Sequence, residues 1–215
     1  MLVEFRATPP SGRLSEALRR QGLAHQLASV DGDRPAVNGL LVASRWPLRR
    51  IRARSGPAES NRWLLARVDA PRPFFLGAMH VPNRVSGRKY PFLDAVLALA
   101  QRWRRGPALL IGDTNSGWIG LDEQAPAFNR REDAWMTALE DASWRDAFRL
   151  LHGDAPAYTW YSPNAGNGFR LDQAFVHAGL TPRLEGTRYE WGRELGSDRH
   201  DALSDHAALM IDLAG

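Results

Sequence analysis

The chain has 215 residues, 44% of them hydrophobic, which is enough to bury a sizeable core and unlike the composition of a disordered segment. It has no cysteine, so disulfides, thiolate catalysis and thiolate-bound zinc are excluded. The net charge is +4, and Lys89 is the only lysine among 28 basic residues. This charge fits a polyanionic partner better than a cationic one, although the codon preference of a GC-rich genome explains most of the arginine bias more simply.

No apolar run approaches the ~20 residues of a transmembrane helix, and the N-terminus lacks the basic and apolar segments of a secretory signal. We therefore expect a cytoplasmic protein with no membrane partner. The sequence shows no internal repeat, linker or low-complexity tract. A single domain over residues 1–215 is the simplest organisation.

Short apolar runs are typical of buried strands, whereas apolar residues spaced three and four apart indicate helices. In chain order we expect the tail of a strand at residues 1–4, a loop at 9–12, a helix at 14–21, strands at 38–44, 62–68 and 74–79, a helix at 91–105 whose closing arginines suit a helix C-terminus, and a strand at 108–111. Further along we expect a loop at 118–130, helices at 132–141 and 144–151, a turn-rich loop at 163–168, and strands at 173–176 and 207–211. This order indicates an α/β core built in layers.

Four of the apolar runs meet a residue that can bind a metal ion or transfer a proton. His80 ends one run, Asp113 follows the next, Asp172 precedes a third, and His206 precedes the last. A sheet that aims the ends of several strands at one point gathers distant residues into a single site. The pattern therefore favours an enzyme.

Two of these places carry a pair of polar residues. Asp113 and Asn115 lie two apart after a buried strand, and alternate residues of an extended chain point the same way, so both can address one substrate or metal ion. The alternative is an Asx turn that ends the strand. Asp205 and His206 offer an oxygen ligand for a hard cation beside a side chain that titrates near neutral pH, and the alternative is an ordinary surface turn.

Asp172 lies in an apolar segment, where a carboxylate without a partner is costly. We expect His206 to be the partner, because the carboxylate would fix the imidazole tautomer and stabilise the imidazolium. The alternative is a structural ion pair between Arg170 and Asp172.

A basic loop follows His80 and carries Arg84, Arg88 and Lys89. Cations in this place suit the oxygen atoms of a phosphate group. A phosphate-facing loop and a structural histidine at a strand end are both compatible with this pattern.

In their order along the chain, four segments resemble the motifs of the endonuclease/exonuclease/phosphatase superfamily: Gly112-Asp113-Thr114-Asn115, Tyr158-Thr159-Trp160, Arg170-Leu171-Asp172 and Ser204-Asp205-His206. This superfamily has the DNase I-like fold and includes exonuclease III and the abasic-site endonucleases. The resemblance runs over residues 4–213. It implies the four-layer α/β form of that fold, a two-sheet β-sandwich flanked by helices, and hydrolysis of a phosphate ester with Mg²⁺ or Mn²⁺.

The resemblance also implies a role for each matching side chain. His206 would contact the phosphate or activate water, and Asp172 would orient it. Asp113 and Asn115 would position the attacking water and the phosphoryl oxygens. His80 would lie against the scissile phosphate. Glu4 and Asp205 would be the metal-binding carboxylates. Carboxylate oxygens suit both cations, and an oriented histidine contributes about 10²–10⁴-fold by proton transfer.

The superfamily normally begins with a strand that carries an asparagine, before the metal-binding glutamate. Glu4 stands almost at the start of this chain, so we expect that first strand to be missing. A misassigned start codon, a fragment and a true loss are all open explanations. A true loss would uncover a sheet edge, which allows a dimer by strand addition in place of the monomer we otherwise expect.

For the substrate we expect DNA, cleaved by a nuclease of the exonuclease III or abasic-site type with a role in DNA repair. In the abasic-site enzymes, the positions that match Trp160, Phe169 and Leu171 form a pocket for a sugar without its base. Stacking on Trp160 or Phe169 would also suit unpaired nucleotides, and ordinary core packing explains all three residues equally well. His80 departs from the abasic-site enzymes, which usually carry a tyrosine there, and this favours general nucleases or phosphatases. Two other hypotheses are a phosphoesterase acting on a lipid headgroup or small phosphate ester, and a catalytically weak DNA-binding remnant.

Overall fold

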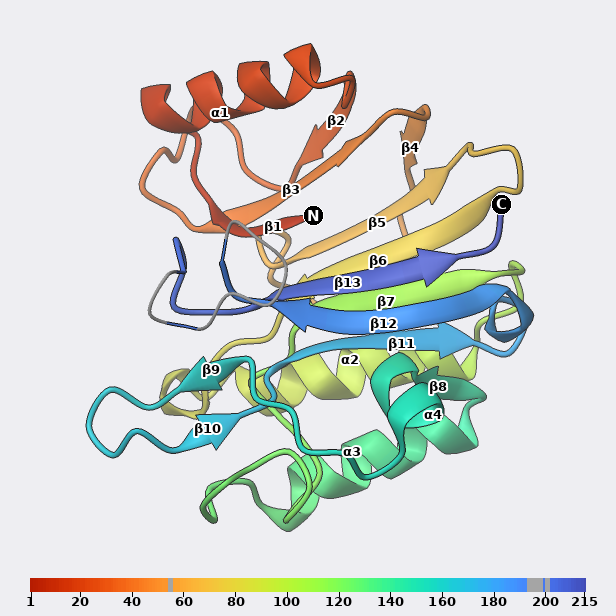
Figure 1. Cartoon of the computed structure of the whole chain (residues 1–215). Helices are drawn as coiled ribbons and strands as arrows, with labels where there is room; N and C mark the ends of the chain where they lie inside the picture. The colour runs from red at the N-terminus through yellow and green to blue at the C-terminus, as the bar shows by residue number, and fades with distance from the viewer. Residues whose placement is uncertain (54–55, 193–198, 200–201) are drawn as a thin grey trace. The chain divides into compact units, whose positions relative to one another are not determined.

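The computed structural model of the protein describes residues 1–53, 56–192, 199 and 202–215. The structure is a mixed α/β fold (Figure 1). It divides into two compact units, Met1–Gly112 and Asp113–Gly215. That the whole chain forms one domain stays a prediction.

The first unit contains two groups of strands. One group is a sheet in the order β1-β3-β2, in which both pairs are antiparallel. The other follows the order β4-β5-β6-β7. The elements are β1 Leu2–Phe5, α1 Pro9–Arg20, β2 His25–Ala28, β3 Gly39–Ser44, β4 Leu48–Arg50, β5 Trp63–Val68, β6 Phe74–His80, the short 3₁₀ helix η1 Arg84–Ser86, α2 Lys89–Gln101 and β7 Ala108–Asp113.

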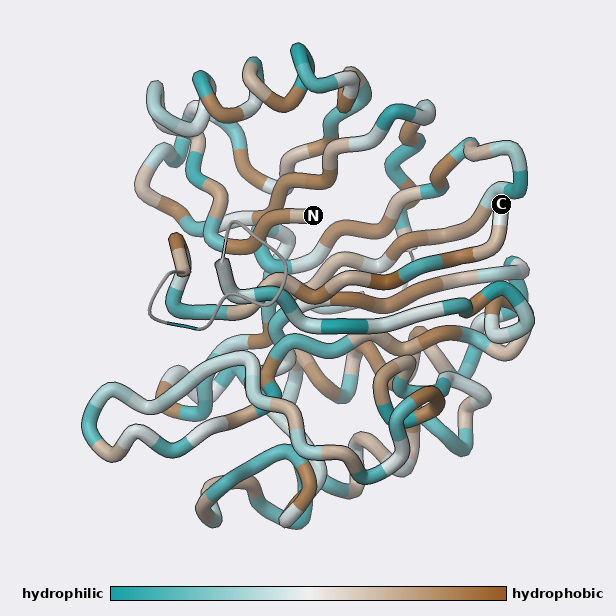
Figure 2. Tube along the Cα trace, in the orientation of Figure 1, coloured by the Kyte–Doolittle hydropathy of each residue, from teal (hydrophilic) through white to brown (hydrophobic). Residues whose placement is uncertain are grey.

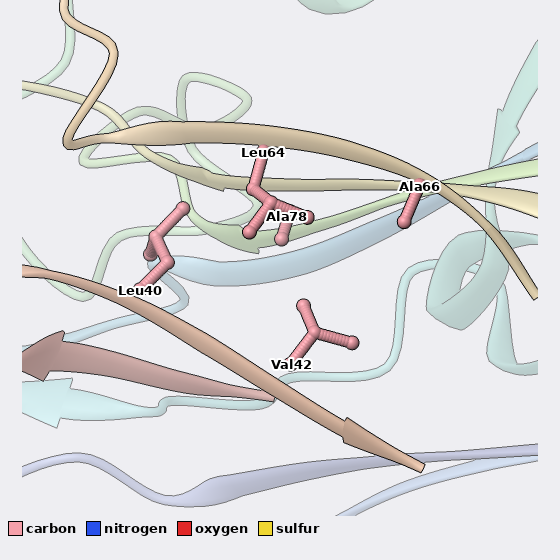
Figure 3. Close-up of a cluster of buried hydrophobic side chains, with 5 residues drawn as sticks. All are labelled: Leu40, Val42, Leu64, Ala66 and Ala78. Atoms are coloured by element: carbon pink, nitrogen blue, oxygen red, sulfur yellow. The ribbon is translucent and has the colours of Figure 1, made fainter. Parts of the chain in front are cut away.

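Alternate residues of three strands build a core in the first unit. Leu40 and Val42 of β3 face Leu64 and Ala66 of β5 and Ala78 of β6 (Figure 3). Residues two apart on a strand share one face of its sheet, so these positions turn the same side of each strand inward. Figure 2 shows that β3, β5 and β6 consist mainly of apolar residues. Two sheets therefore pack face to face within this unit, as expected for a β-sandwich.

The second unit is built from antiparallel strand pairs and two helices. β9 pairs with β10, β11 with β8, and β12 with β13. Asn129 and Glu132 form a capping box at the start of α3, which explains why that helix begins at Arg130. The elements are α3 Arg130–Asp141, β8 Trp144–Asp146, α4 Ala147–His152, β9 Trp160–Tyr161, β10 Gly168–Phe169, β11 Asp172–His177, the 3₁₀ helix η2 Thr181–Arg183, β12 Leu184–Glu190 and β13 Ala208–Leu213.

The helix α1 begins earlier than the sequence predicts, and α2 ends earlier. α1 starts at Pro9, where a loop was expected, because a proline in the first turn has no N–H to satisfy and its fixed φ suits a helix. α2 ends at Gln101. The arginines expected in its last turn therefore lie beyond it: Arg102, Arg104 and Arg105.

The segment predicted as one helix at residues 144–151 is a strand followed by a helix. β8 ends at Asp146, whose carboxylate accepts hydrogen bonds from the backbone N–H groups of Phe148 and Arg149 and so caps α4. The sequence patterns also miss β2, β4 and β12, which are partly polar and exist as strands through their pairing with neighbours. Within the described ranges no helix is long and apolar enough to cross a membrane.

Candidate active site

The second unit brings Asp172 and His206 together, as predicted. Asp172 is the first residue of β11, and His206 lies two residues before β13. Oδ2 of Asp172 accepts a hydrogen bond from Nδ1 of His206 at 2.7 Å. Asp172 is 9% exposed, and this contact fixes the orientation of the imidazole.

The alternative pairing of Asp172 with Arg170 is wrong. Arg170 is fully buried and instead pairs with Asp122 at 2.7 Å and Asp146 at 2.6 Å. Arg149 also pairs with Asp122. We refer to Arg170, Arg149, Asp122 and Asp146 as the buried ion network.

The surroundings of His206 favour its charged form. Burial lowers the pKa of the ring, but the hydrogen bond to Asp172 and the negative charges of Asp172, Asp113 and Asp205 raise it, and the balance raises the pKa from 6.5 to about 9. At neutral pH the ring is therefore an imidazolium. Such a ring can donate a hydrogen bond to a phosphoryl oxygen or a proton to a leaving group.

Asp113 and Asn115 form the Asx turn that was the alternative to a shared site. Oδ1 of Asp113 accepts the backbone N–H of Asn115 at 2.9 Å, and Oδ2 accepts the side-chain amide of Asn115 at 3.1 Å. The turn does not remove Asp113 from the neighbourhood of the dyad, because its charge still acts on His206. Both interpretations of this segment are therefore compatible with the structure.

Two neighbouring residues hold this turn. Thr114 is fully buried and donates both its N–H, at 2.8 Å, and its hydroxyl, at 2.9 Å, to the carbonyl oxygen of Leu171. Gly112 has φ +149, and a Cβ there would lie 1.8 Å from the carbonyl oxygen of Met79 in β6. Only glycine allows this approach, so the backbone is held closely at Gly112 as well as at Thr114.

The aromatic residues predicted to bind substrate lie on one face of the β9–β10 hairpin. Trp160 pairs with Phe169 across the hairpin, and their ring centroids are 6.0 Å apart. The ring of Trp160 is 6.3 Å from that of His206. Trp160 is half-buried, whereas Phe169 is 8% exposed. Trp160 is thus the ring of this pair with a surface left for a ligand, and Phe169 supports it.

The other predicted site residues belong to the first unit. Glu4 is exposed in β1, and His80 is buried at the end of β6. Arg84 opens η1 and Arg88 directly precedes α2, and both are exposed, but Lys89 is the first residue of α2 and only 3% exposed. The convergence of these residues with Asp172 and His206 stays a prediction.

Backbone strain coincides with two of the predicted site residues. Among the residues that the structure describes, the non-glycine residues with positive φ are Glu4 at +56, Asn115 at +46 and Ser143 at +69. Glu4 also lies where the register of β1 with β3 shifts, as at a β-bulge. Such backbone is costly for these residue types and gathers at functional sites.

A divalent cation, which the family typically uses, needs several oxygen ligands. The candidate carboxylates have the right chemistry, but no group of three or more His, Asp or Glu residues in the described part of the chain is arranged to hold a metal ion. Glu4 and Asp205 belong to different units. A cation held by both stays a prediction.

Sequence reasoning missed the residues that support the site. Asp122 stands in a predicted loop and Asp146 in a predicted helix, so neither pattern signals a buried ion partner. Thr159 lies inside a recognised motif, but nothing in the sequence indicates that its hydroxyl binds the backbone of Asp172. Its place in the Tyr158-Thr159-Trp160 motif was the feature of the sequence that could have indicated a role for Thr159.

The model of the endonuclease/exonuclease/phosphatase family matches residues 4–206 of this chain. Among curated proteins, an exodeoxyribonuclease of Streptococcus pneumoniae is 33% identical over 119 residues, which cover 46% of this chain and 43% of the relative. The match thus spans less than half the length of that relative.

Solved structures with a similar fold include two proteins at 20% sequence identity. An AP endonuclease from Archaeoglobus fulgidus superposes with a TM-score of 0.76 over 98% of this chain and 85% of its own. A 3′ phosphatase from Neisseria, bound to a product DNA hairpin, gives 0.73 over 94% and 83%. At this identity the likeness shows the fold alone, which is that of AP endonucleases and of the DNase I-like proteins.

Proposed function

The chain belongs to the endonuclease/exonuclease/phosphatase family, and from that premise we propose that it is a phosphodiesterase that hydrolyses DNA, of the exonuclease III or AP-endonuclease kind, dependent on Mg²⁺ or Mn²⁺. A role in DNA repair follows from that substrate. The observation that carries the proposal is the contact between Asp172 and His206, with the carboxylate of Asp113 close enough to act on the same ring.

The arrangement supplies two of the needs of in-line hydrolysis of a phosphodiester. The imidazolium of His206 neutralises charge on a non-bridging oxygen or protonates the leaving alkoxide, and Asp172 keeps it charged and oriented. Asp113, held in its turn by Asn115, would be the carboxylate that orients the attacking water. A divalent cation, when bound, would neutralise further charge on the phosphate and stabilise the leaving oxygen.

Three observations support DNA as the substrate. The chain carries a net charge of +4, and Trp160 presents a partly open ring beside His206, as a stacking residue for an unpaired base or a bare sugar would. Arg84 and Arg88 are exposed cations in the first unit, suited to phosphate contacts. The names of the relatives, an exodeoxyribonuclease and a DNA-bound 3′ phosphatase, agree with this substrate class.

One observation favours a second candidate, removal of a terminal phosphate from DNA or from a small ester. His80 stands where the abasic-site enzymes usually carry a tyrosine, and it is buried at the end of β6. A phosphatase of this kind would use the same Asp172–His206 pair, so the two candidates differ in substrate rather than in chemistry.

The test is a panel of substrates with purified full-length protein, with and without Mg²⁺ or Mn²⁺: an abasic-site duplex, an intact duplex, a duplex with a 3′ phosphate, and a small phosphate diester. We expect metal-dependent cleavage of at least one DNA substrate, faster than that of the small ester. His206→Ala should lose about 10²–10⁴-fold in rate. Salt-sensitive DNA binding without turnover in the wild type would instead identify a catalytically weak binding protein.

A further inference from the structure

Thr159 lies between the two chain segments that carry the Asp172–His206 pair. It directly precedes β9 and is fully buried, while its neighbours Tyr158 and Trp160 are half-buried. Its position in the sequence is far from both partners, so only the fold brings the three together.

The hydroxyl of Thr159 binds the backbone at the start of β11. Its Oγ1 accepts the N–H of Leu171 at 2.9 Å and the N–H of Asp172 at 3.1 Å. These residues mark the step between β10, which ends at Phe169, and β11, which begins at Asp172. A hydroxyl oxygen has two lone pairs, and here both are directed to buried backbone donors.

The main chain of Thr159 binds the other side of the pair. Its carbonyl oxygen accepts the N–H of Ala207 at 2.9 Å, and Trp160 forms an antiparallel bridge with His206. Its own N–H donates to the carbonyl oxygen of Phe169 at 2.7 Å. One buried residue is thus hydrogen-bonded to Asp172 by its side chain and to the residue after His206 by its backbone.

We propose that Thr159 is a positioning residue that sets the 2.7 Å contact between Asp172 and His206. This rests on the proposed function, because the contact matters to catalysis only if the pair acts on a phosphate. Thr159 does not touch the reacting atoms, since it is fully buried and its hydroxyl is directed at the backbone of Leu171 and Asp172. It acts by fixing the backbone from which each partner projects, and a displacement of about 1 Å in such a geometry costs about 10²-fold in rate.

The hydroxyl is the part of Thr159 that the proposal makes essential. Valine has nearly the shape of threonine but no acceptor, and serine keeps the acceptor without the methyl group. Thr187 offers a matched control in the same unit: it is 5% exposed in β12, and its Oγ1 has no hydrogen-bond partner within the described residues. Thr187→Val therefore removes a buried hydroxyl that has no hydrogen-bond partner among the described residues.

The experiment compares Thr159→Val, Thr159→Ser, Thr187→Val and the wild type in two measurements. The first is kcat and KM on the best DNA substrate of the panel. We expect Thr159→Val to lower kcat about 10²-fold with KM within about twofold, and we expect Thr159→Ser and Thr187→Val to stay within about threefold of the wild type. We expect kcat to fall while KM stays nearly unchanged because Thr159 does not contact the substrate.

The second measurement reads the contact itself, by the proton NMR signal of the Nδ1–H of His206, which a short hydrogen bond to a carboxylate moves far downfield. We expect this signal in the wild type, in Thr159→Ser and in Thr187→Val, and its loss or an upfield shift in Thr159→Val. If the wild type hydrolyses no substrate, the proposed function fails, but this signal still tests the role of Thr159.

A folded Thr159→Val protein with wild-type kcat and an unmoved signal would overturn the proposal. Equal damage in Thr159→Ser would also overturn it, because the methyl group rather than the hydroxyl would then matter. If Thr159→Val does not fold, the same two measurements compare Thr159→Ser with Thr159→Cys. Cysteine has nearly the shape of serine, but its sulfur is a poor hydrogen-bond acceptor. A Thr159→Cys enzyme as active as Thr159→Ser would contradict the proposal.

Discussion

Arg170 and Asp172 are two residues apart in the chain but belong to different regions of the second unit. Arg170 enters the buried ion network, where no water reaches it and its charge is balanced by Asp122 and Asp146. Asp172 opens β11 beside a half-buried His206 and near exposed Asp205. The charges of the buried ion network are paired with one another away from solvent. The Asp172–His206 pair instead leaves a cationic ring partly exposed at the surface of the unit.

The two regions use charge for different purposes. Burial lowers the pKa of Arg170, but its interactions with Asp146, Tyr189 and Asp122 raise it well above its ordinary value, so this cation is permanent. The pKa of His206 lies at about 9, within reach of ordinary conditions, so this ring can exchange its proton. A permanent buried pair suits structure, whereas an exchangeable proton at a partly open place suits chemistry.

The largest effect is expected from removing the central cation of the buried ion network, which tests whether the network has a structural role. Arg170→Met leaves the carboxylates of Asp122 and Asp146 buried without their partner, and we expect a loss of about 3–5 kcal/mol in the free energy of unfolding. Urea denaturation measures it. A loss below about 1 kcal/mol would mean that the network is not a structural element.

Trp160 tests whether the open region meets a ligand. Trp160→Ala should raise KM for DNA with unpaired or abasic nucleotides by about 5- to 150-fold, because base stacking on an aromatic ring contributes about 1–3 kcal/mol. Tyr161→Ala is the matched control, since Tyr161 follows on the same strand and faces Gly168 rather than Phe169. An unchanged KM with a lower melting temperature would make Trp160 a packing residue only.

The titration of His206 follows from its partners. Its pKa in the folded protein, about 9, lies above the ordinary value of 6.5, so its contribution to stability is fully present below pH 6.5 and is lost as the pH rises through about 9. NMR titration of the ring should give that pKa, and Asp172→Asn should lower it. A pKa near 6.5 in the wild type would contradict the stated balance of burial and charge.

The smallest effect is expected at a surface pair. Arg188 pairs with Asp212 at 2.6 Å and with Glu190 at 3.3 Å, but its side chain is 44% exposed. Arg188→Met should change the free energy of unfolding by at most about 1 kcal/mol. The same measurement used for Arg170→Met checks it, and a loss as large as that of Arg170→Met would remove the distinction between buried and exposed pairs.

The contact between Asp172 and His206 could be predicted because the residues around each of them in the sequence indicate its chemistry. A carboxylate in an apolar strand needs a partner, and His206 was the partner that its motif offered. The same reasoning could not find the ion network, because Asp122 and Asp146 are brought to Arg170 by the fold from segments without a distinctive pattern. The spacing of apolar residues predicts which face of a strand is buried. It does not predict which carboxylate, far away in the sequence, will contact that face.

The strands show the same limit. The apolar strands β3, β5, β6 and β7 were predictable from their composition, whereas β2 and β4 carry polar residues and take their form from pairing with β3 and β5. The start of α1 was missed because Pro9 was interpreted as a loop signal rather than as the first residue of a helix. Local signals thus identified the Asp172–His206 contact but not the partly polar strands of the fold.

The central claim, that Asp172 and His206 act as one unit on a phosphate, is tested most directly by a double-mutant cycle of Asp172→Asn and His206→Ala in the rate of DNA cleavage. Residues that act as a unit have non-additive effects. We predict that the double variant is no slower than His206→Ala alone. Rate losses that multiply in the double variant would contradict the account.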